Sequence, residues 1–208
     1  MTSTAAAGHR RKPAEQRKAE IVAVAAELAL ANGLEALTLR RVAEALGVFP
    51  GLVNHYFPAV DELVAAAFAD VAEAELRDVF ELVEVAGPPL AQMRALIGQL
   101  VSEEQDKVSL LWLDAWHTAR RRPALHVEVS RLMEAWRDRV VEVIERGRDG
   151  GVFRVDDPAA SATMIMAAID GMSVQAAMRA SLDYSVVRRW VVSTAERELG
   201  LPPGALAG

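Results

Sequence analysis

The chain has 208 residues, 52% of them hydrophobic, which is enough apolar material to bury a core and excludes an intrinsically disordered chain. The absence of cysteine excludes a disulfide scaffold, cysteine-ligated zinc and thiol catalysis. Every apolar run is shorter than the ~18 residues that a membrane span needs. No apolar segment follows the basic residues near the start, as one would in a secretory signal. We therefore expect a soluble protein of the cytoplasm.

The net charge of −6 is distributed unevenly along the chain. Residues 1–60 hold seven Lys and Arg against five Asp and Glu, whereas the rest of the chain holds sixteen against twenty-four. Such an asymmetry is typical of a small polyanion-binding module that is joined to a larger acidic body. The sequence therefore predicts two functional parts.

Short helices separated by turn residues are predicted for the first 60 residues. After a flexible basic arm over 1–12, apolar residues recur at helical spacing from Pro13 to a stop at Asn32. Thr38 is a candidate N-cap of a second short helix, and a third begins at Pro50. Two short helices after a longer one predict a helix-turn-helix unit.

The remaining sequence predicts a series of longer amphipathic helices. The first covers 61–85, where apolar residues repeat at helical spacing. Glycine and proline signals separate five more helices, predicted over 90–104, 107–121, 124–147, 157–181 and 185–199. The tail 200–208 is rich in Gly and Pro and is expected to fray. No segment alternates with period two, so we predict an all-α chain with about nine helices.

The stretch GVFPGLVNHYF, residues 47–57, places an unusual group of polar and aromatic residues after a turn. On a helical wheel, Val53 and Phe57 share the face that packs on the first two helices. The opposite face holds a small residue, an amide and an imidazole, namely Gly51, Asn54 and His55. An Asn side chain can pair bidentately with adenine, and a Gly allows close approach to a groove. This favours a DNA-reading helix, although an ordinary polar helix face fits the wheel as well.

The segment over 18–64, with LTLRRVAEALGVFPGLVNHYFPAVDELV at its centre, resembles the DNA-binding domain of the TetR (tetracycline-repressor) family of transcriptional regulators. The stretch GLVNHYF is most similar to the sequences of the BetI-like, choline-regulator branch. The later stretches LLWLDAWHTARRRPAL and AAIDGM resemble the C-terminal domain of that branch. The resemblance implies a ligand-responsive regulator, most simply a repressor, that binds a palindromic operator as a homodimer. Its parts would be the arm, a DNA-binding domain over 13–60, and an effector-binding and dimerisation domain over 61–199.

The resemblance also implies which residues contact DNA. These are Thr38, Arg40, Arg41, Pro50, Gly51, Leu52, Asn54, His55 and Tyr56. Two positions depart from the family pattern, because Phe49 replaces a frequent helix-capping Ser and Val60 replaces a phosphate-binding Lys. A lost N-cap costs about 1 kcal/mol, and a lost phosphate contact flattens the salt dependence of binding by about one unit of log–log slope. The departures bear on DNA affinity and operator sequence rather than on the fold.

The last two predicted helices are candidates for a dimer interface, because one helix-turn-helix unit reads too few base pairs for useful specificity. The predicted interface residues are Ile165, Ile169, Met172, Ala176, Val187, Trp190, Val191 and Thr194. Small residues allow helices to approach closely in a four-helix dimer core, and family members dimerise through their last two long helices. The alternative is that these residues form the core of one subunit.

Tryptophans in the second half of the chain indicate an effector pocket. The predicted pocket residues are Phe68, Trp112, Trp116, Met133 and Trp136. Several indoles around a cavity attract a quaternary ammonium by cation–π interaction, and Asp114 and Asp170 are candidate counter-charges. The alternative is that such aromatics are simply core. We expect a small, largely apolar or cationic effector.

Motifs of catalysis and metal binding are missing from the sequence. The four histidines form no HExxH, and there is no P-loop, GxGxxG or GxSxG. Asp114 and His117 stand three residues apart without a nearby nucleophile and are interpreted as a surface pair. We predict no cofactor, metal or catalytic residue, and keep two alternatives open: a helical protein–protein adaptor and a small all-α enzyme, neither binding DNA.

Overall fold

The computed structural model describes residues 13–176 and 183–207 of the chain, with the side chain of residue 176 left out. Within those ranges it contains α-helices, two short 3-10 turns and no strand, so the predicted all-α class is confirmed. The helices are α1 (Ala14–Asn32), α2 (Leu39–Leu46), α3 (Pro50–Tyr56), α4 (Val60–Val85), α5 (Pro89–Leu100), α6 (Asp106–Ala119), α7 (Pro123–Asp149), α8 (Pro158–Ala176) and α9 (Tyr184–Glu198). The 3-10 turns are η1 (Leu34–Ala36) and η2 (Glu103–Gln105). The predicted arm lies outside the described residues.

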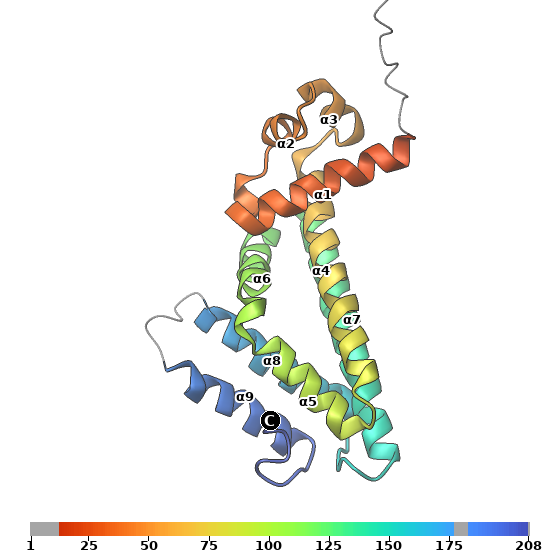
Figure 1. Ribbon diagram of the computed structural model, residues 1–208, viewed down its shortest axis with the longest axis vertical. Coiled ribbons are helices and arrows are strands. Elements are labelled where there is room, and N and C mark those ends of the chain that lie inside the picture. The colour runs from red at the N-terminus through yellow and green to blue at the C-terminus, as the bar shows by residue number, and fades with distance from the viewer. Residues whose placement is uncertain (1–12, 177–182, 208) are drawn as a thin grey trace, which may run out of the picture.

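Figure 1 shows α1, α2 and α3 together at one end of the molecule, which we call the N-terminal unit. The helices α4 to α9 form the body below it. Within the body, α4 and α7 run beside each other from the N-terminal unit to the far end, where α5, α8 and α9 lie. The helix α4 also packs on α1, so it contacts both the N-terminal unit and the body and connects the two parts.

Local sequence accounts for the short helices of the N-terminal unit. The Thr38 hydroxyl accepts a hydrogen bond of 3.1 Å from the Arg41 backbone N–H, which caps α2 as predicted. Gly47 ends α2 with φ of 65°, a left-handed conformation that glycine adopts without the strain of a Cβ atom. Pro50 occupies the first turn of α3, where its missing N–H costs nothing.

One predicted boundary in the body differs from the structure, and another cannot be compared with it. The helix expected over 90–104 ends at Leu100, and η2 follows it. The helix expected over 157–181 is described as far as Ala176, and the remainder lies outside the described residues.

The tail does not fray over 201–207, in contrast to the prediction. The Arg94 guanidinium donates a hydrogen bond of 2.6 Å to the Ala205 carbonyl oxygen. The Leu206 backbone N–H donates one of 2.9 Å to the buried Glu196 carboxylate, and the Leu206 side chain is buried. Side-chain burial and polar contacts with α5 and α9 therefore fix a segment whose Gly and Pro content suggested disorder.

Candidate functional site

The outward face of α3 carries the polar residues of the GLVNHYF stretch. Gly51, Asn54 and His55 are exposed, while Val53 and Phe57 are buried in the core of the N-terminal unit. The two flanking predicted residues, Leu52 and Tyr56, are half-buried, and Pro50 is exposed. No atom lies within 4 Å of the position that a Cβ at Gly51 would occupy. The helix therefore presents an open surface with an exposed amide and an exposed imidazole, the latter edge-on to the Tyr56 ring at 5.2 Å.

The predicted contact residues of α2 are exposed, but both arginines have partners within the N-terminal unit. The Arg40 guanidinium forms an ion pair of 2.7 Å with Glu44, one turn further along α2. The Arg41 guanidinium donates to the Asn32 side-chain oxygen and to the Ala36 carbonyl oxygen, each at 3.2 Å. Arg41 thus holds the end of α1 against the start of α2 when no partner is bound.

The two departures from the family pattern have visible structural consequences. Phe49 occupies the N-cap position of α3, offers no side-chain acceptor to the helix and is 88% exposed. Val60 is the first residue of α4, is half-buried and packs against the core. The start of α3 is therefore left without a side-chain cap, and Val60 offers no positive charge to a phosphate.

A cavity with a volume of about 70 Å³ lies in the body between α4, α6, α7 and α8. Its lining includes four of the five predicted pocket residues, Trp112, Trp116, Met133 and Trp136. The remaining lining residues are Glu75, Leu100, Gln105, Ser109, Met166, Ile169, Asp170 and Ser173. Three indoles, two carboxylic acids and two hydroxyls thus surround one small space.

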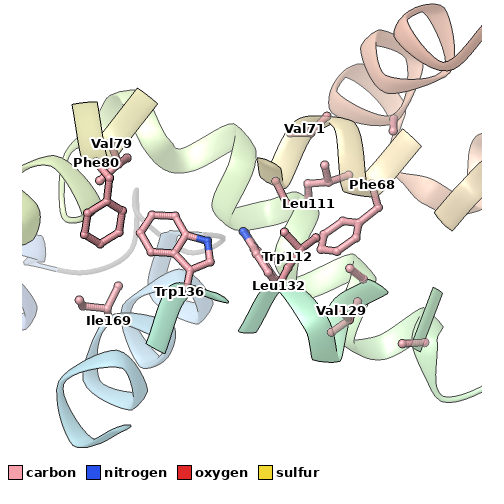
Figure 2. Close-up of a cluster of buried hydrophobic side chains, with 14 of the residues drawn as sticks. Phe68, Val71, Val79, Phe80, Leu111, Trp112, Val129, Leu132, Trp136 and Ile169 are labelled. Carbon is pink, nitrogen blue, oxygen red and sulfur yellow. The ribbon is translucent and has the colours of Figure 1, made fainter. Parts of the chain in front are cut away.

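Aromatic contacts fix the tryptophans of the cavity (Figure 2). The Trp112 ring meets the Phe68 ring edge to face, with centroids 4.9 Å apart, and lies 5.7 Å from the Trp116 ring. The Trp136 ring is tilted against the Phe80 ring at 5.6 Å. Phe68 is fully buried and stands behind Trp112, outside the lining. The prediction that Phe68 lines the pocket is therefore wrong, because Phe68 supports Trp112 from the core.

Two acids, Glu75 and Asp170, give the cavity its electrostatic character, and only Asp170 was predicted from the sequence. Burial raises the pKa of Glu75 to about 7, against the smaller opposing effect of a hydrogen bond of 2.8 Å from the Trp112 indole N–H. The nearby Asp170 carboxylate raises the Glu75 pKa further. Burial also raises the pKa of Asp170 to about 6. Both acids stand where a positive charge would stabilise their ionised forms.

The other candidate counter-charge, Asp114, does not reach the cavity. Its carboxylate accepts a hydrogen bond of 2.6 Å from the Leu34 backbone N–H, in the turn that follows α1. The interpretation of Asp114 and His117 as a surface pair is therefore wrong for Asp114, whose partner is 80 residues away in the sequence.

One donor in the cavity has no partner within the described structure. The Trp116 indole N–H is buried and makes no hydrogen bond, although the Trp116 ring lines the cavity. A buried N–H without an acceptor is costly. Among the lining residues that the structure describes, Trp116 therefore supplies the one buried side-chain donor without an acceptor.

Most of the predicted dimer-interface residues are buried inside the subunit. These are Ile165, Ile169, Met172, Val191 and Thr194, whose side chains the subunit's own helices cover. Ile169 lines the cavity instead. The alternative, that they form the core of one subunit, is correct for these five residues. Val187 is half-buried and Trp190 is 48% exposed, whereas the side chain at 176 lies outside the described part of the structure.

Of the predicted interface residues, Trp190 lies on the outward face of α8 and α9, together with three residues that were not predicted. The large exposed apolar side chains on these helices are Met164, Val174, Val186 and Trp190. Trp190 lies over Gly171, because a Cβ on that glycine would stand 3.8 Å from the indole ring. The exposed apolar stripe of α8 is thus displaced by one residue or two from the stripe that the wheel suggested.

Two negative findings limit the chemistry of the described residues. No group of three or more His, Cys, Asp or Glu side chains within 13–176 and 183–207 is arranged to hold a metal ion. Within the same ranges, no helix is both long and apolar enough to cross a membrane.

The two parts of the molecule match two separate family models. Residues 21–67 match the model described as bacterial regulatory proteins of the tetR family. Residues 89–200, more than half of the chain, match the model described as BetI-type transcriptional repressor, C-terminal. The first model ends within α4, the helix that connects the N-terminal unit with the body, and the second begins at the start of α5.

Individual relatives agree with these models. The chain is 29% identical over 129 residues to the transcriptional regulator BetI of Paraburkholderia phymatum, an alignment that covers 57% of this chain and 64%, less than two thirds, of that protein. A TetR transcription regulator from Haloarcula marismortui has a similar structure, with a TM-score of 0.76 and 23% identity over 88% of this chain and 98% of the other. A regulator from Saccharomonospora viridis, solved in complex with choline, is also similar in structure. Its TM-score is 0.70 and its sequence identity is 19%, over 89% of this chain and 98% of the other. The chain belongs to the TetR family of bacterial regulators, with a C-terminal domain of the BetI type.

Proposed function

We propose that the protein is a ligand-responsive transcriptional regulator, most simply a repressor, that binds a palindromic operator as a homodimer. The observation that carries the proposal is the outward face of α3, where Asn54 and His55 are exposed while Val53 and Phe57 on the inner face are buried. A recognition helix needs this division, because its inner face fixes its orientation while its outer face enters the major groove. The names of the matched family models support the same function.

The experiment is a selection of duplexes from a random library by the purified full chain, followed by fluorescence anisotropy of the selected and a scrambled duplex. We expect a selected sequence with two-fold symmetry and a large preference over the scrambled duplex. Equal binding of both duplexes would contradict sequence-specific regulation. Binding to a partner protein and not to any duplex would favour the adaptor, and turnover that His117→Ala abolishes would favour an enzyme.

The exposed apolar residues of α8 and α9 support the homodimer. An apolar patch of this kind on helices that are otherwise packed on one side is typical of a protein–protein interface. We place the interface at Met164, Val174, Val186 and Trp190 rather than at the buried residues of the same helices. Trp190→Glu should shift the sedimentation of the chain from dimer to monomer. The control is Thr163→Glu, at an exposed position of α8, which should leave a larger fraction of dimer than Trp190→Glu at the same protein concentration.

We propose that the effector is a small cation that also carries a hydrogen-bond acceptor. Three indole rings and the carboxylates of Glu75 and Asp170 favour a positive charge in the cavity. The unpartnered indole N–H of Trp116 favours an acceptor atom beside that charge. The choline complex of the structurally similar Saccharomonospora viridis regulator is consistent with this chemistry. A volume of about 70 Å³ restricts the occupant to a compact molecule unless side chains move.

Tryptophan fluorescence of the purified chain tests the effector class. Choline is the cation with an acceptor, tetramethylammonium is the cation without one, and neohexanol is the uncharged isostere of choline. We expect choline to bind most tightly and neohexanol most weakly. Because a bound cation favours the ionised acids, choline binding should weaken as the pH falls through the pKa values of about 7 and about 6. Equal binding of neohexanol would contradict the charge recognition.

Release from DNA requires that the effector prefers a geometry in which the two recognition helices no longer fit their half-sites. The helix α4 supports this mechanism, because it carries Glu75 into the cavity and only three residues separate it from the end of α3. A shift of α4 would change the separation of the two α3 helices in the dimer. Half-sites about one helical turn apart tolerate little change of that separation.

A further inference from the structure

The helix α6 contacts the cavity on one face and the N-terminal unit on the other. Trp112 and Trp116 are one turn apart and line the cavity. Asp114 lies midway between them in the sequence, about 200° around the helix from each, and so faces away from the cavity. Its carboxylate meets the Leu34 backbone N–H at 2.6 Å. In Figure 1 the upper end of α6 lies beneath the end of α1, where this contact is made.

The backbone at the end of α1 is shaped to admit the Asp114 carboxylate. Gly33 has φ of 82°, a conformation that strains residues with a side chain. A Cβ atom on Gly33 would also stand 2.8 Å from the Asp114 carboxylate oxygen, closer than a side chain tolerates. Glycine at position 33 therefore lets the Asp114 carboxylate approach the backbone, because it adopts the positive φ without strain and has no Cβ atom in the way.

The hydrogen bond joins groups that have few alternative partners. Leu34 is fully buried and begins η1, so the Leu34 N–H lies at a helix start where a donor needs an external acceptor. A carboxylate that accepts from a backbone N–H forms a short, strong hydrogen bond. At the other face of α6, the Trp112 indole N–H is bonded to Glu75 of α4 at 2.8 Å. A rotation or translation of α6 therefore has to move Leu34 with it or break a strong contact.

We propose that Asp114 is the positioning residue through which α6 transmits the state of the cavity to the N-terminal unit. The inference rests on the proposed DNA-binding function and adds to it a route separate from the α4 connection. Occupation of the cavity displaces Trp112 and Trp116, α6 moves as a rigid helix, and Asp114 carries the movement to the turn between α1 and α2. Arg41 then relays it, because its guanidinium joins Asn32 of α1 and Ala36 to the first turn of α2.

The same route must work in reverse, because coupling between two sites is reciprocal. DNA bound to the N-terminal unit should change α6, and this can be measured without an identified effector. The experiment uses the full chain and a duplex that the chain has selected from a random library. Anisotropy of the labelled duplex reports DNA binding, and hydrogen exchange of the backbone amides over 106–119 reports the response of α6.

In the parent chain we expect saturating duplex to slow exchange in α6 by about fivefold, the lower end of usual coupling between sites. In Asp114→Ala we expect the duplex to bind while the slowing falls below about twofold. Asp114→Asn keeps an acceptor oxygen for the Leu34 N–H and should retain most of the slowing. The matched control is Asp138→Ala, which removes an exposed acid of α7 that pairs with its chain neighbour Arg137 and should behave as the parent does.

Each other outcome overturns the inference in a recognisable way. Equal slowing in Asp114→Ala and the parent would show that the movement takes another route. Bound duplex with no slowing in the parent would show that α6 does not respond to DNA. If the parent binds no duplex at all, anisotropy reports it directly, and the proposed function fails before the coupling does. If Asp114→Ala fails to fold, Asp114→Asn carries the test. It must then retain the slowing of hydrogen exchange in α6 when the duplex binds.

Discussion

The DNA-facing surface of α3 and the cavity of the body are built in opposite ways. On α3, the candidate functional side chains are neighbours within one short helix, and the exposed ones contribute little to the packing of the core. In the cavity, most of the functional side chains are buried or half-buried, and they come from four different helices. Substitutions on α3 should therefore alter binding with little effect on stability. Substitutions in the cavity should alter both.

Trp112→Ala should give the largest effect, because Trp112 serves the core and the cavity together. The substitution removes the edge-to-face contact with Phe68 and leaves the Glu75 carboxylate without its indole donor. We expect the free energy of unfolding to fall by about 3–5 kcal/mol. Urea unfolding measures the loss. The matched substitution on α3, His55→Ala, should change stability by less than about 0.5 kcal/mol, and a similar loss there would break the comparison.

Glu75→Gln tests the electrostatics of the cavity. The folded-state pKa of Glu75, about 7, lies above the usual 4.5, so the folded chain holds this proton more tightly than the unfolded chain. The stability from that proton is complete below about pH 4.5 and is lost as the pH rises through about 7. Glutamine cannot ionise, so the substitution removes the free-energy cost of a buried charge at high pH, while the amide oxygen still accepts the hydrogen bond from the Trp112 indole N–H.

At about pH 8 we expect Glu75→Gln to be more stable than the parent by about 2–3 kcal/mol. The advantage should disappear below about pH 5. Thermal unfolding at several pH values measures both. Asp170→Asn is the companion variant, with a smaller gain because the pKa of Asp170 is about 6. A parent chain whose stability does not fall between pH 5 and 8 would contradict the buried-acid assignment.

Asn54→Ala should leave stability unchanged and weaken DNA binding. Asn54 is exposed on α3, and no hydrogen bond within the described residues holds its side chain. We expect specific binding to weaken by about 1–3 kcal/mol, with relaxed preference at one base pair in each half-site. Anisotropy on the selected duplex and its single-base variants measures both effects. An equal loss on selected and random duplexes would mean that Asn54 does not read a base.

Phe49→Ser should give the smallest effect, and it is a gain. Serine at the N-cap position of α3 can accept from a free backbone N–H, which the phenyl ring cannot. Since Phe49 is 88% exposed, little packing is lost. We expect a stabilisation of about 0.5–1 kcal/mol in urea unfolding. Phe49→Ala, which removes the ring without supplying a cap, is the control, and an equal gain there would assign the effect to the exposed ring.

The candidate site was predictable where neighbouring residues decide it. The Thr38 cap, the Gly47 stop and the inward Val53 and Phe57 follow from spacing along one short segment. The cavity was only partly predictable. Trp112 and Trp116 share a helix face, but Glu75 and Asp170 lie on α4 and α8, and no pattern in the sequence joins them. The interface residues on α8 were misplaced, because that helix is apolar on several faces and a wheel cannot say which face meets the subunit's own core.

The helices, their order and the TetR-type N-terminal unit are predictable from the sequence alone. Caps, turn glycines and 3.6-residue periodicity act between residues within about four positions of each other, so they can be read along the chain. The acids that enter the cavity, the exposed face of α8 and the contact of Asp114 with Leu34 could be found only from the packed molecule. These features depend on how helices cross and how closely they approach, and the packing of the whole molecule sets both.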